Sequence, residues 1–182
     1  MISVYIREDY KSHENNSREF AKRCIREYSG IADFTEFSFA ENEFGKPFIA
    51  NIDSDIHFSL SHSGNILVCA VARFNIGVDC QIVNIKDAAR CKKIAERFYS
   101  PQEKLFLDGL PDADYISNFF KIWTKKEAYI KYTGRGLSQG LSTFSVISPE
   151  SERGDDVRFK RVAPELPNMF IYLCCEENLG LF

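Results

Sequence analysis

Apolar and polar positions follow a strand-like period in the first half of this chain and a helical period in much of the second half. In the first half, runs of alternating or continuous apolar residues predict strands over 3–6, 57–61, 66–74 and 78–83. One helix is predicted there, over 14–28, because its apolar residues share one side and Ser29-Gly30 stops it. Between these elements, Gly45 and Pro47 predict a loop.

The predicted strands 66–74 and 78–83 are separated by the turn residues Asn75-Ile76-Gly77. Two strands joined by so short a turn usually pair with each other in an antiparallel hairpin. The sequence therefore predicts a hairpin of these two strands.

In the second half, helical spacing predicts helices over 88–98, 101–107 and 112–131. Ser100-Pro101-Gln102-Glu103 has the form of a capping box with proline at the first helical position. Strands are predicted after the helices, over 144–147, 157–160 and 169–174. Strands and helices that occur in successive clusters indicate an α+β fold rather than strict βα alternation.

Composition fits one compact unit spanning residues 1–182, since 45% of positions are hydrophobic and 16 are Phe. The longest apolar run, Ile66–Ala72, is too short for a transmembrane helix. The first residues lack the pattern of a secretion signal, so we expect a cytoplasmic protein. A net charge of −3 argues against bulk binding of nucleic acid.

The chain has six cysteines, and none of them forms a CxxC pair. Several are flanked by apolar residues, where cysteine behaves as a small hydrophobic residue. The three histidines show no zinc-ligand spacing relative to them. We therefore expect reduced cysteines in the core and no zinc site.

Two pairs of polar residues lie at spacings that place them on common faces. Asp79 and Gln81 are two apart on a predicted strand, and Glu127 and Lys131 are four apart on the longest predicted helix. If the strand packs on the helix, Asp79 and Glu127 would converge into a site of the kind that Mg²⁺ accepts with phosphate oxygens. The spacing equally fits an exposed Glu127–Lys131 pair and a solvated Asp79, so it leaves these readings open.

Three segments resemble the signature blocks of the 4′-phosphopantetheinyl transferases, of the longer, monomeric surfactin-synthetase type. They are Phe58-Ser59-Leu60-Ser61-His62-Ser63, Ile76-Gly77-Val78-Asp79-Cys80 and Trp123-Thr124-Lys125-Lys126-Glu127-Ala128-Tyr129-Ile130-Lys131. Gly45-Lys46-Pro47 and Phe98-Tyr99-Ser100-Pro101-Gln102-Glu103 match two further elements in the expected order. The matching blocks occupy about half of the chain, and their order makes the resemblance specific.

The resemblance implies transfer of the 4′-phosphopantetheine arm of coenzyme A to a serine of an apo acyl or peptidyl carrier protein. It implies a monomer with a 4′-phosphopantetheinyl transferase-like fold of two similar α+β halves, about 1–86 and 87–182, related by a pseudo-twofold axis. The expected partners are coenzyme A and an acidic carrier, which basic residues within 86–104 and 121–135 would steer. The alternative is a catalytically impaired homologue that binds coenzyme A or the carrier.

By the same resemblance, Asp79 and Glu127 hold Mg²⁺, or Mn²⁺, against the diphosphate of coenzyme A. Glu127 would also act as the base, and Lys131 would offset charge on the diphosphate. Gln81 stands where the family usually has a second acidic residue, so we expect weaker magnesium binding with activity kept.

The resemblance also implies contacts with coenzyme A. Lys46 and Pro47 match residues that line the coenzyme pocket, and Ser61 and His62 match the block that holds its 3′-phosphate end. Arg18, near the start of the first predicted helix, is a further candidate phosphate contact.

Overall fold

The computed structural model describes residues 1–12, 16–31, 36–52, 55–83, 88–147, 157–166 and 168–176. Its strands are β1 (Ile2–Arg7), β2 (Phe39–Glu41), β3 (Pro47–Ile49), β4 (His57–Ser63), β5 (Ile66–Ala72), β6 (Gly77–Ile82), β7 (Val157–Arg161) and β8 (Met169–Glu176). Its α-helices are α1 (Ser17–Ser29), α2 (Ala88–Phe98), α3 (Pro101–Asp108) and α4 (Asp112–Thr133), and two short 3₁₀ turns follow at Gly136–Gln139 and Leu141–Thr143. The predicted α+β class is confirmed.

The division into two similar halves, about 1–86 and 87–182, stays a prediction. Its boundary falls within residues 84–87, outside the described part of the chain, as do positions 14 and 15 of the first predicted helix.

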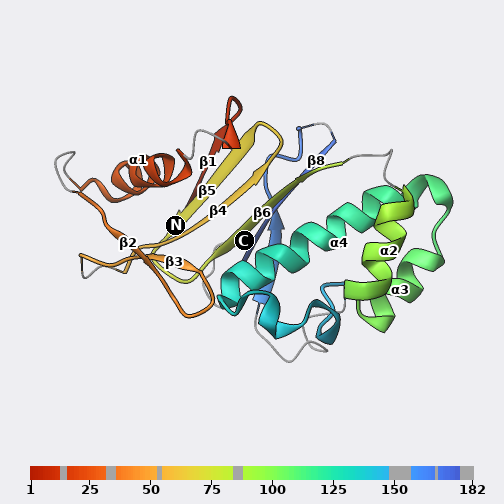
Figure 1. The fold of residues 1–182 in the computed structure, drawn as a ribbon. Helices are drawn as coiled ribbons and strands as arrows, with labels where there is room; N and C mark the ends of the chain where they lie inside the picture. The colour runs from red at the N-terminus through yellow and green to blue at the C-terminus, as the bar shows by residue number, and fades with distance from the viewer. Residues whose placement is uncertain are drawn as a thin grey trace.

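Two antiparallel sheets form the centre of the molecule, with helices on their outer sides (Figure 1). The first sheet has the strand order β1-β5-β4, and α1 packs on one face of it through a core that includes Ile25, Phe58 and Val71. The second sheet has the order β6-β8-β7. Val68, Val78 and other residues of β5, β6 and β8 form a core between the sheets.

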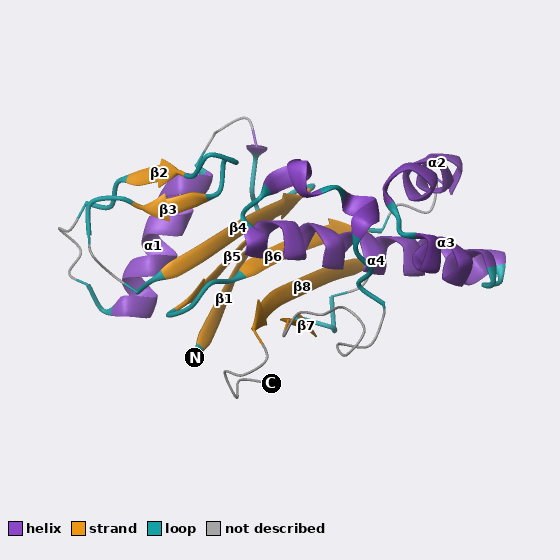
Figure 2. Cartoon of the chain, turned by 90° about the horizontal axis from the view of Figure 1, so that it is seen from below, coloured by secondary structure: helices purple, strands orange, loops and turns teal. Residues whose placement is uncertain are grey.

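Helix α4 lies along β6 and β8, on the side of the second sheet away from that shared core (Figure 2). Side chains alternate along a strand, so Val78 and Cys80 enter the shared core while Gly77, Asp79 and Gln81 face α4. The absence of a side chain at Gly77 lets the two backbones touch. This arrangement places Asp79 next to the helix that carries Glu127.

The predicted hairpin of strands 66–74 and 78–83 is wrong. β5 pairs with β1 and β4, whereas β6 pairs with β8, with Asp79 opposite Tyr172. β6 nevertheless runs beside β4, and serine hydroxyls take the place of backbone carbonyls there. The Oγ atoms of Ser59, Ser61 and Ser63 accept hydrogen bonds from the backbone N–H groups of Val78, Cys80 and Ile82 at 3.0, 3.1 and 3.0 Å. We call these three residues the serine ladder.

Two predictions for the second half of the chain, the capping box and the longest helix, are confirmed. The predicted capping box begins α3: the Oγ of Ser100 accepts from the Glu103 N–H, and the Ser100 N–H donates to the Glu103 carboxylate. The helix predicted over 112–131 is α4, which ends at Gly134 in a left-handed conformation.

The strand predicted over 144–147 is wrong, because this segment is a loop bound to a buried ion pair. Lys126 and Glu103 are 2.7 Å apart, and both side chains are fully buried. Glu103 accepts a hydrogen bond from the Val146 N–H at 2.8 Å, and Lys126 donates to the carbonyl of Phe144 at 2.7 Å. Backbone groups that a strand would pair with another strand are therefore satisfied by charged side chains.

All six cysteines are buried and none is in a disulfide, as predicted. Within the described ranges, no helix is both long enough and apolar enough to cross a membrane.

Candidate functional site

A buried carboxylate lies at the centre of the candidate site. Asp79 in β6 is 2% exposed and is surrounded by donors from three elements. Its Oδ1 accepts hydrogen bonds from the Ser61 hydroxyl in β4 and from the Lys131 ammonium in α4, each at 2.7 Å. Its Oδ2 accepts from the Gln81 side-chain amide at 3.1 Å. These contacts fix the orientation of the carboxylate.

Glu127 lies one turn before Lys131 on the same face of α4 and is half-buried. Burial raises the pKa of Glu127, the negative charge of Asp79 raises it further, and Lys131 opposes both effects. Within the described residues, no hydrogen bond or ion pair joins its carboxylate to another side chain or to the backbone. The structure thus brings Asp79, Gln81, Glu127 and Lys131 together and leaves Glu127 available for a proton or a cation.

This donor set fits a divalent metal ion that keeps part of its water shell. In the part of the chain that the structure describes, no three or more His, Cys, Asp or Glu side chains are grouped so that they could hold a metal ion. The protein therefore offers two carboxylates, Asp79 and Glu127, and the amide oxygen of Gln81. Mg²⁺ is commonly held by one or two carboxylates together with waters and substrate phosphates, whereas Zn²⁺ is usually held by three or four protein ligands, mostly His and Cys.

A cavity of about 270 Å³ lies beside these residues. Lys131 and Ile130 line it from α4, Leu60 lines it from β4, and Phe44, Lys46 and Pro47 line it from β3 and the turn before it. Lys131 thus lines the cavity and also contacts Asp79, so a ligand in the cavity would meet this one member of the charged cluster.

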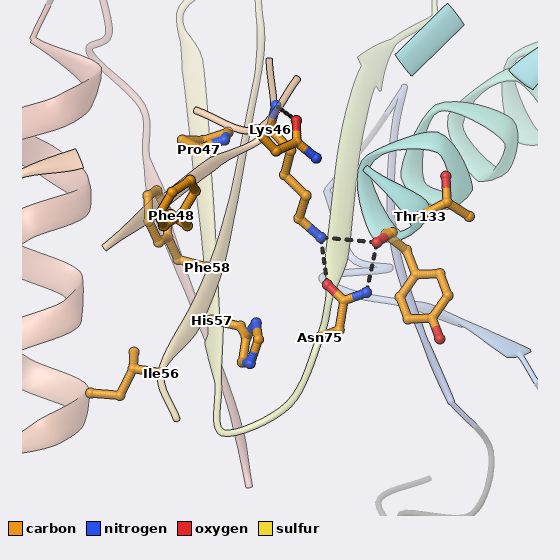
Figure 3. Close-up of a pocket in the computed structure, with 10 residues that line it drawn as sticks. Lys46, Pro47, Phe48, Ile56, His57, Phe58, Asn75 and Thr133 are labelled. Carbon is orange, nitrogen blue, oxygen red and sulfur yellow. Dashed lines mark hydrogen bonds between the residues drawn. The ribbon is translucent and has the colours of Figure 1, made fainter. Parts of the chain in front are cut away.

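Lys46 fastens this turn to the end of α4. Its ammonium donates to the side-chain oxygen of Asn75 and to the Tyr132 carbonyl at 2.9 Å (Figure 3). It also donates to the Ile76 carbonyl at 3.4 Å. Burial lowers the pKa of Lys46 to about 8. An ammonium has only three N–H donors, so each donor already has a protein acceptor.

A second cavity, of about 230 Å³, lies on the other side of Lys46 and is lined by His57, Phe48 and Thr133 among others (Figure 3). Burial lowers the pKa of His57, and the nearby Lys46 lowers it further. Pro47 lines both cavities, so the predicted coenzyme-lining residues Lys46 and Pro47 stand between them.

Two predicted phosphate contacts lie apart from Asp79. His62 is exposed, and its ring meets Tyr10 edge to face at 5.3 Å between ring centres. It follows Ser61 in β4, so the two side chains leave opposite faces of the strand. Arg18 is exposed on α1 and forms an ion pair with Glu41 at 3.0 Å. Neither His62 nor Arg18 contacts Asp79.

Sequence reasoning missed the buried role of Lys126, which it counted among the basic residues of an exposed face. Lys126 instead joins α3, α4 and the loop after α4 through Glu103. The sequence-based prediction also missed the serine ladder, although serines at every second position of a strand indicate one polar face.

Comparison with known proteins gives the same family as the signature blocks. Residues 75–167 match the family model described as the 4′-phosphopantetheinyl transferase superfamily. The chain is 39% identical over 114 residues to the 4′-phosphopantetheinyl transferase gsp of Aneurinibacillus migulanus. The aligned residues make up 63% of this chain and 45% of that protein. It is 44% identical over 101 residues to psf-1 of Bacillus pumilus, covering 56% and 41%. To Sfp of Bacillus subtilis (strain 168) it is 36% identical over 114 residues, covering 63% and 49%.

The chain spans about half the length of the curated relatives it matches. The family match contains Asp79, Gln81, Glu127 and Lys131, whereas Lys46 and His62 lie before it.

Proposed function

Because the chain belongs to the 4′-phosphopantetheinyl transferase superfamily, we propose that it transfers the 4′-phosphopantetheine arm of coenzyme A to a serine hydroxyl of an apo acyl or peptidyl carrier protein. The serine oxygen forms a bond to the β-phosphorus of the coenzyme diphosphate. The bond from that phosphorus to the bridging oxygen breaks, and adenosine 3′,5′-bisphosphate leaves. One observation carries the proposal: Asp79, Glu127 and Lys131 form a charged cluster beside a cavity of about 270 Å³.

Glu127 is the proposed base. Its carboxylate has no partner among the described residues, and burial together with Asp79 raises its pKa toward the range in which a base accepts a proton. It takes the proton that the attacking serine hydroxyl loses, directly or through one water molecule.

Asp79 and Glu127 would hold Mg²⁺ or Mn²⁺, with Gln81 as a neutral neighbour. When bound, the ion supplies positive charge that offsets the negative charge of the diphosphate. Gln81 contributes no charge, so we expect this site to need a higher magnesium concentration than a site with a third carboxylate.

Lys131 is the proposed contact for the leaving phosphate oxygen. Its ammonium lies 2.7 Å from Asp79, and its side chain also lines the cavity. Rotation about its flexible side chain would carry the ammonium from the carboxylate to a diphosphate in the cavity, where it offsets developing negative charge.

We place coenzyme A in the cavity bordered by Lys46 and Pro47. Lys46 would act there through the turn that it fastens, since its own donors have protein acceptors. His62 would meet the 3′-phosphate end, and Arg18 would add a contact only after its pair with Glu41 opens.

Carrier recognition is proposed to use the basic residues of α2. Arg90, Lys92, Lys93 and Arg97 are exposed there, and an acidic carrier would be attracted to them.

One chain supplies both Asp79 and Glu127, so a monomer would suffice. Reduced cysteine thiols fit a cytoplasmic location.

Gln81 also supports a second candidate, a homologue that binds coenzyme A or a carrier without catalysis, because its amide replaces a charged ligand. Mass spectrometry of an apo carrier incubated with the protein, coenzyme A and Mg²⁺ separates the two. A gain of one phosphopantetheine group that is lost in Glu127→Ala supports the transferase. The exposed Glu165→Ala serves as the matched control and should keep the modification. An unchanged carrier mass, with coenzyme A bound, supports the second candidate.

A further inference from the structure

We propose that Ser61 is a positioning residue that holds the carboxylate of Asp79, a role different from the phosphate contact that the resemblance implies. This inference rests on the proposed function, because Asp79 has its proposed importance as a ligand of a divalent ion. It concerns one hydroxyl group that joins β4 to the charged cluster between β6 and α4.

The two hydrogen bonds of Ser61 determine where its proton lies. A serine hydroxyl has one proton to donate and two lone pairs to accept with. The Oγ of Ser61 accepts from the Cys80 N–H at 3.1 Å, and it lies 2.7 Å from the Oδ1 of Asp79. An ionised carboxylate only accepts, so Ser61 donates its proton to Asp79. A phosphate oxygen would need the same proton.

The position of Ser61 supports this reading. Its side chain is buried between β4 and β6, while the neighbouring His62 side chain is exposed on the other face of the strand. A buried hydroxyl that bonds a charged acceptor is one of the stronger hydrogen bonds in a protein.

Ser61 would matter most when Lys131 leaves Asp79 for a diphosphate. In the structure, both Ser61 and Lys131 donate to Oδ1, and Gln81 donates to Oδ2. Once the ammonium moves, Ser61 is the remaining donor to Oδ1 in this network. It then holds the Asp79 carboxylate in the orientation that the structure shows. Groups that orient a metal ligand commonly change metal affinity about 10- to 100-fold when removed.

The serine ladder offers a matched control. Ser63 accepts a hydrogen bond from the Ile82 N–H at 3.0 Å, as Ser61 does from Cys80, but it makes no bond to Asp79. Ser63→Ala therefore removes a rung of the ladder alone. Ser61→Ala removes both a rung and the bond to Asp79. Ser61→Cys keeps a side chain of similar size with a much weaker donor.

The experiment measures two affinities for the wild-type protein and the three variants. The first is the affinity for Mn²⁺, followed by electron paramagnetic resonance of the free ion with coenzyme A present. The second is the affinity for adenosine 3′,5′-bisphosphate without metal, followed by calorimetry. We expect Ser61→Ala and Ser61→Cys to weaken Mn²⁺ binding about 10-fold or more, with Ser63→Ala unchanged. The metal-free affinity for the nucleotide should stay within about twofold for all variants.

The proposal is overturned if Mn²⁺ binds the Ser61 variants as tightly as it binds Ser63→Ala. Weaker nucleotide binding with unchanged Mn²⁺ binding would assign Ser61 to the phosphate instead. If Ser61→Ala does not fold, as judged by its thermal transition, Ser61→Cys decides. Failure of the carrier assay would reject the proposed function without altering the Mn²⁺ comparison, whereas a wild-type protein that binds no Mn²⁺ would reject this inference.

Discussion

The backbone of Gly77 in β6 lies directly against the backbone of Ala128 in α4. A Cβ on residue 77 would lie 2.0 Å from the Ala128 carbonyl oxygen and 2.4 Å from the backbone nitrogen of Tyr132. Atoms of a helix backbone cannot turn aside as a flexible side chain can. This contact therefore sets the separation between the strand that carries Asp79 and the helix that carries Glu127.

Gly77→Ala is expected to push β6 and α4 apart. We predict a loss of roughly 1–3 kcal/mol in the free energy of unfolding, the usual range for overpacking, and a weaker apparent affinity for Mg²⁺. Denaturant unfolding and magnesium titration of carrier modification measure the two effects. Gly109→Ala is the control, since its Cβ would meet its nearest atoms at 3.6 Å. Equal behaviour of the two variants would show that the close contact does not position the site.

Gln81→Glu should raise the affinity for Mg²⁺. The Gln81 amide now donates to Asp79, and a carboxylate at this position would add a third negative charge beside Asp79 and Glu127. The magnesium concentration for half-maximal carrier modification should therefore fall, and stability without magnesium should fall as well, because like charges repel. An unchanged magnesium requirement would mean that residue 81 is not near the metal ion.

Lys126→Met should be strongly destabilising. Lys126 and Glu103 form a fully buried ion pair, so the substitution leaves the buried Glu103 charge without its countercharge. Breaking such a pair typically costs about 3–5 kcal/mol in unfolding free energy. Lys121→Met, at an exposed position of the same helix, should change it by less than about 0.5 kcal/mol. Similar denaturant midpoints for the two variants would contradict the structural role given to Lys126.

Glu127→Gln should stabilise the protein at neutral pH while it removes activity. The pKa of Glu127 is higher in the folded state than in an unfolded chain, so its stabilising contribution is present below the unfolded pKa and is lost as pH rises through the folded pKa. The variant, which cannot ionise, should therefore match the wild type near pH 4 and melt at a higher temperature at pH 7. Thermal melting between these values tests this, with Glu165→Gln as an exposed control. A variant that melts lower at pH 7 would be the contrary result.

Elements determined by nearby residues could be predicted well from the sequence. The capping box at Ser100 and Glu103 lies within four residues, and its form in the structure is the expected one. The hairpin of 66–74 with 78–83 failed because strand pairing depends on distant partners. β8 lies about ninety residues after β6 in the chain and pairs with one edge of β6. The serine ladder accepts hydrogen bonds from the backbone N–H groups at the other edge of β6.

The candidate site could be predicted only in part. Periodicity places Asp79 on one face of a strand and Glu127 with Lys131 on one face of a helix, but spacing alone does not say that these faces meet. The resemblance to a family supplied that link, and Gly77 supplies its physical basis. The hydrogen bonds of Lys46 could not be predicted from the sequence, because two of its acceptors are backbone carbonyls, which every residue has.

The central claim is that Asp79 and Glu127 hold one divalent ion against a diphosphate. Crystals of the protein grown with Mn²⁺ and coenzyme A test it, because anomalous scattering locates manganese independently of the protein atoms. We predict a single strong peak bonded to both carboxylates and to the coenzyme diphosphate, with the Lys131 ammonium moved from Asp79 toward a phosphate oxygen. Bound coenzyme with manganese elsewhere, or with Lys131 still paired to Asp79 and no ion touching Glu127, would contradict it.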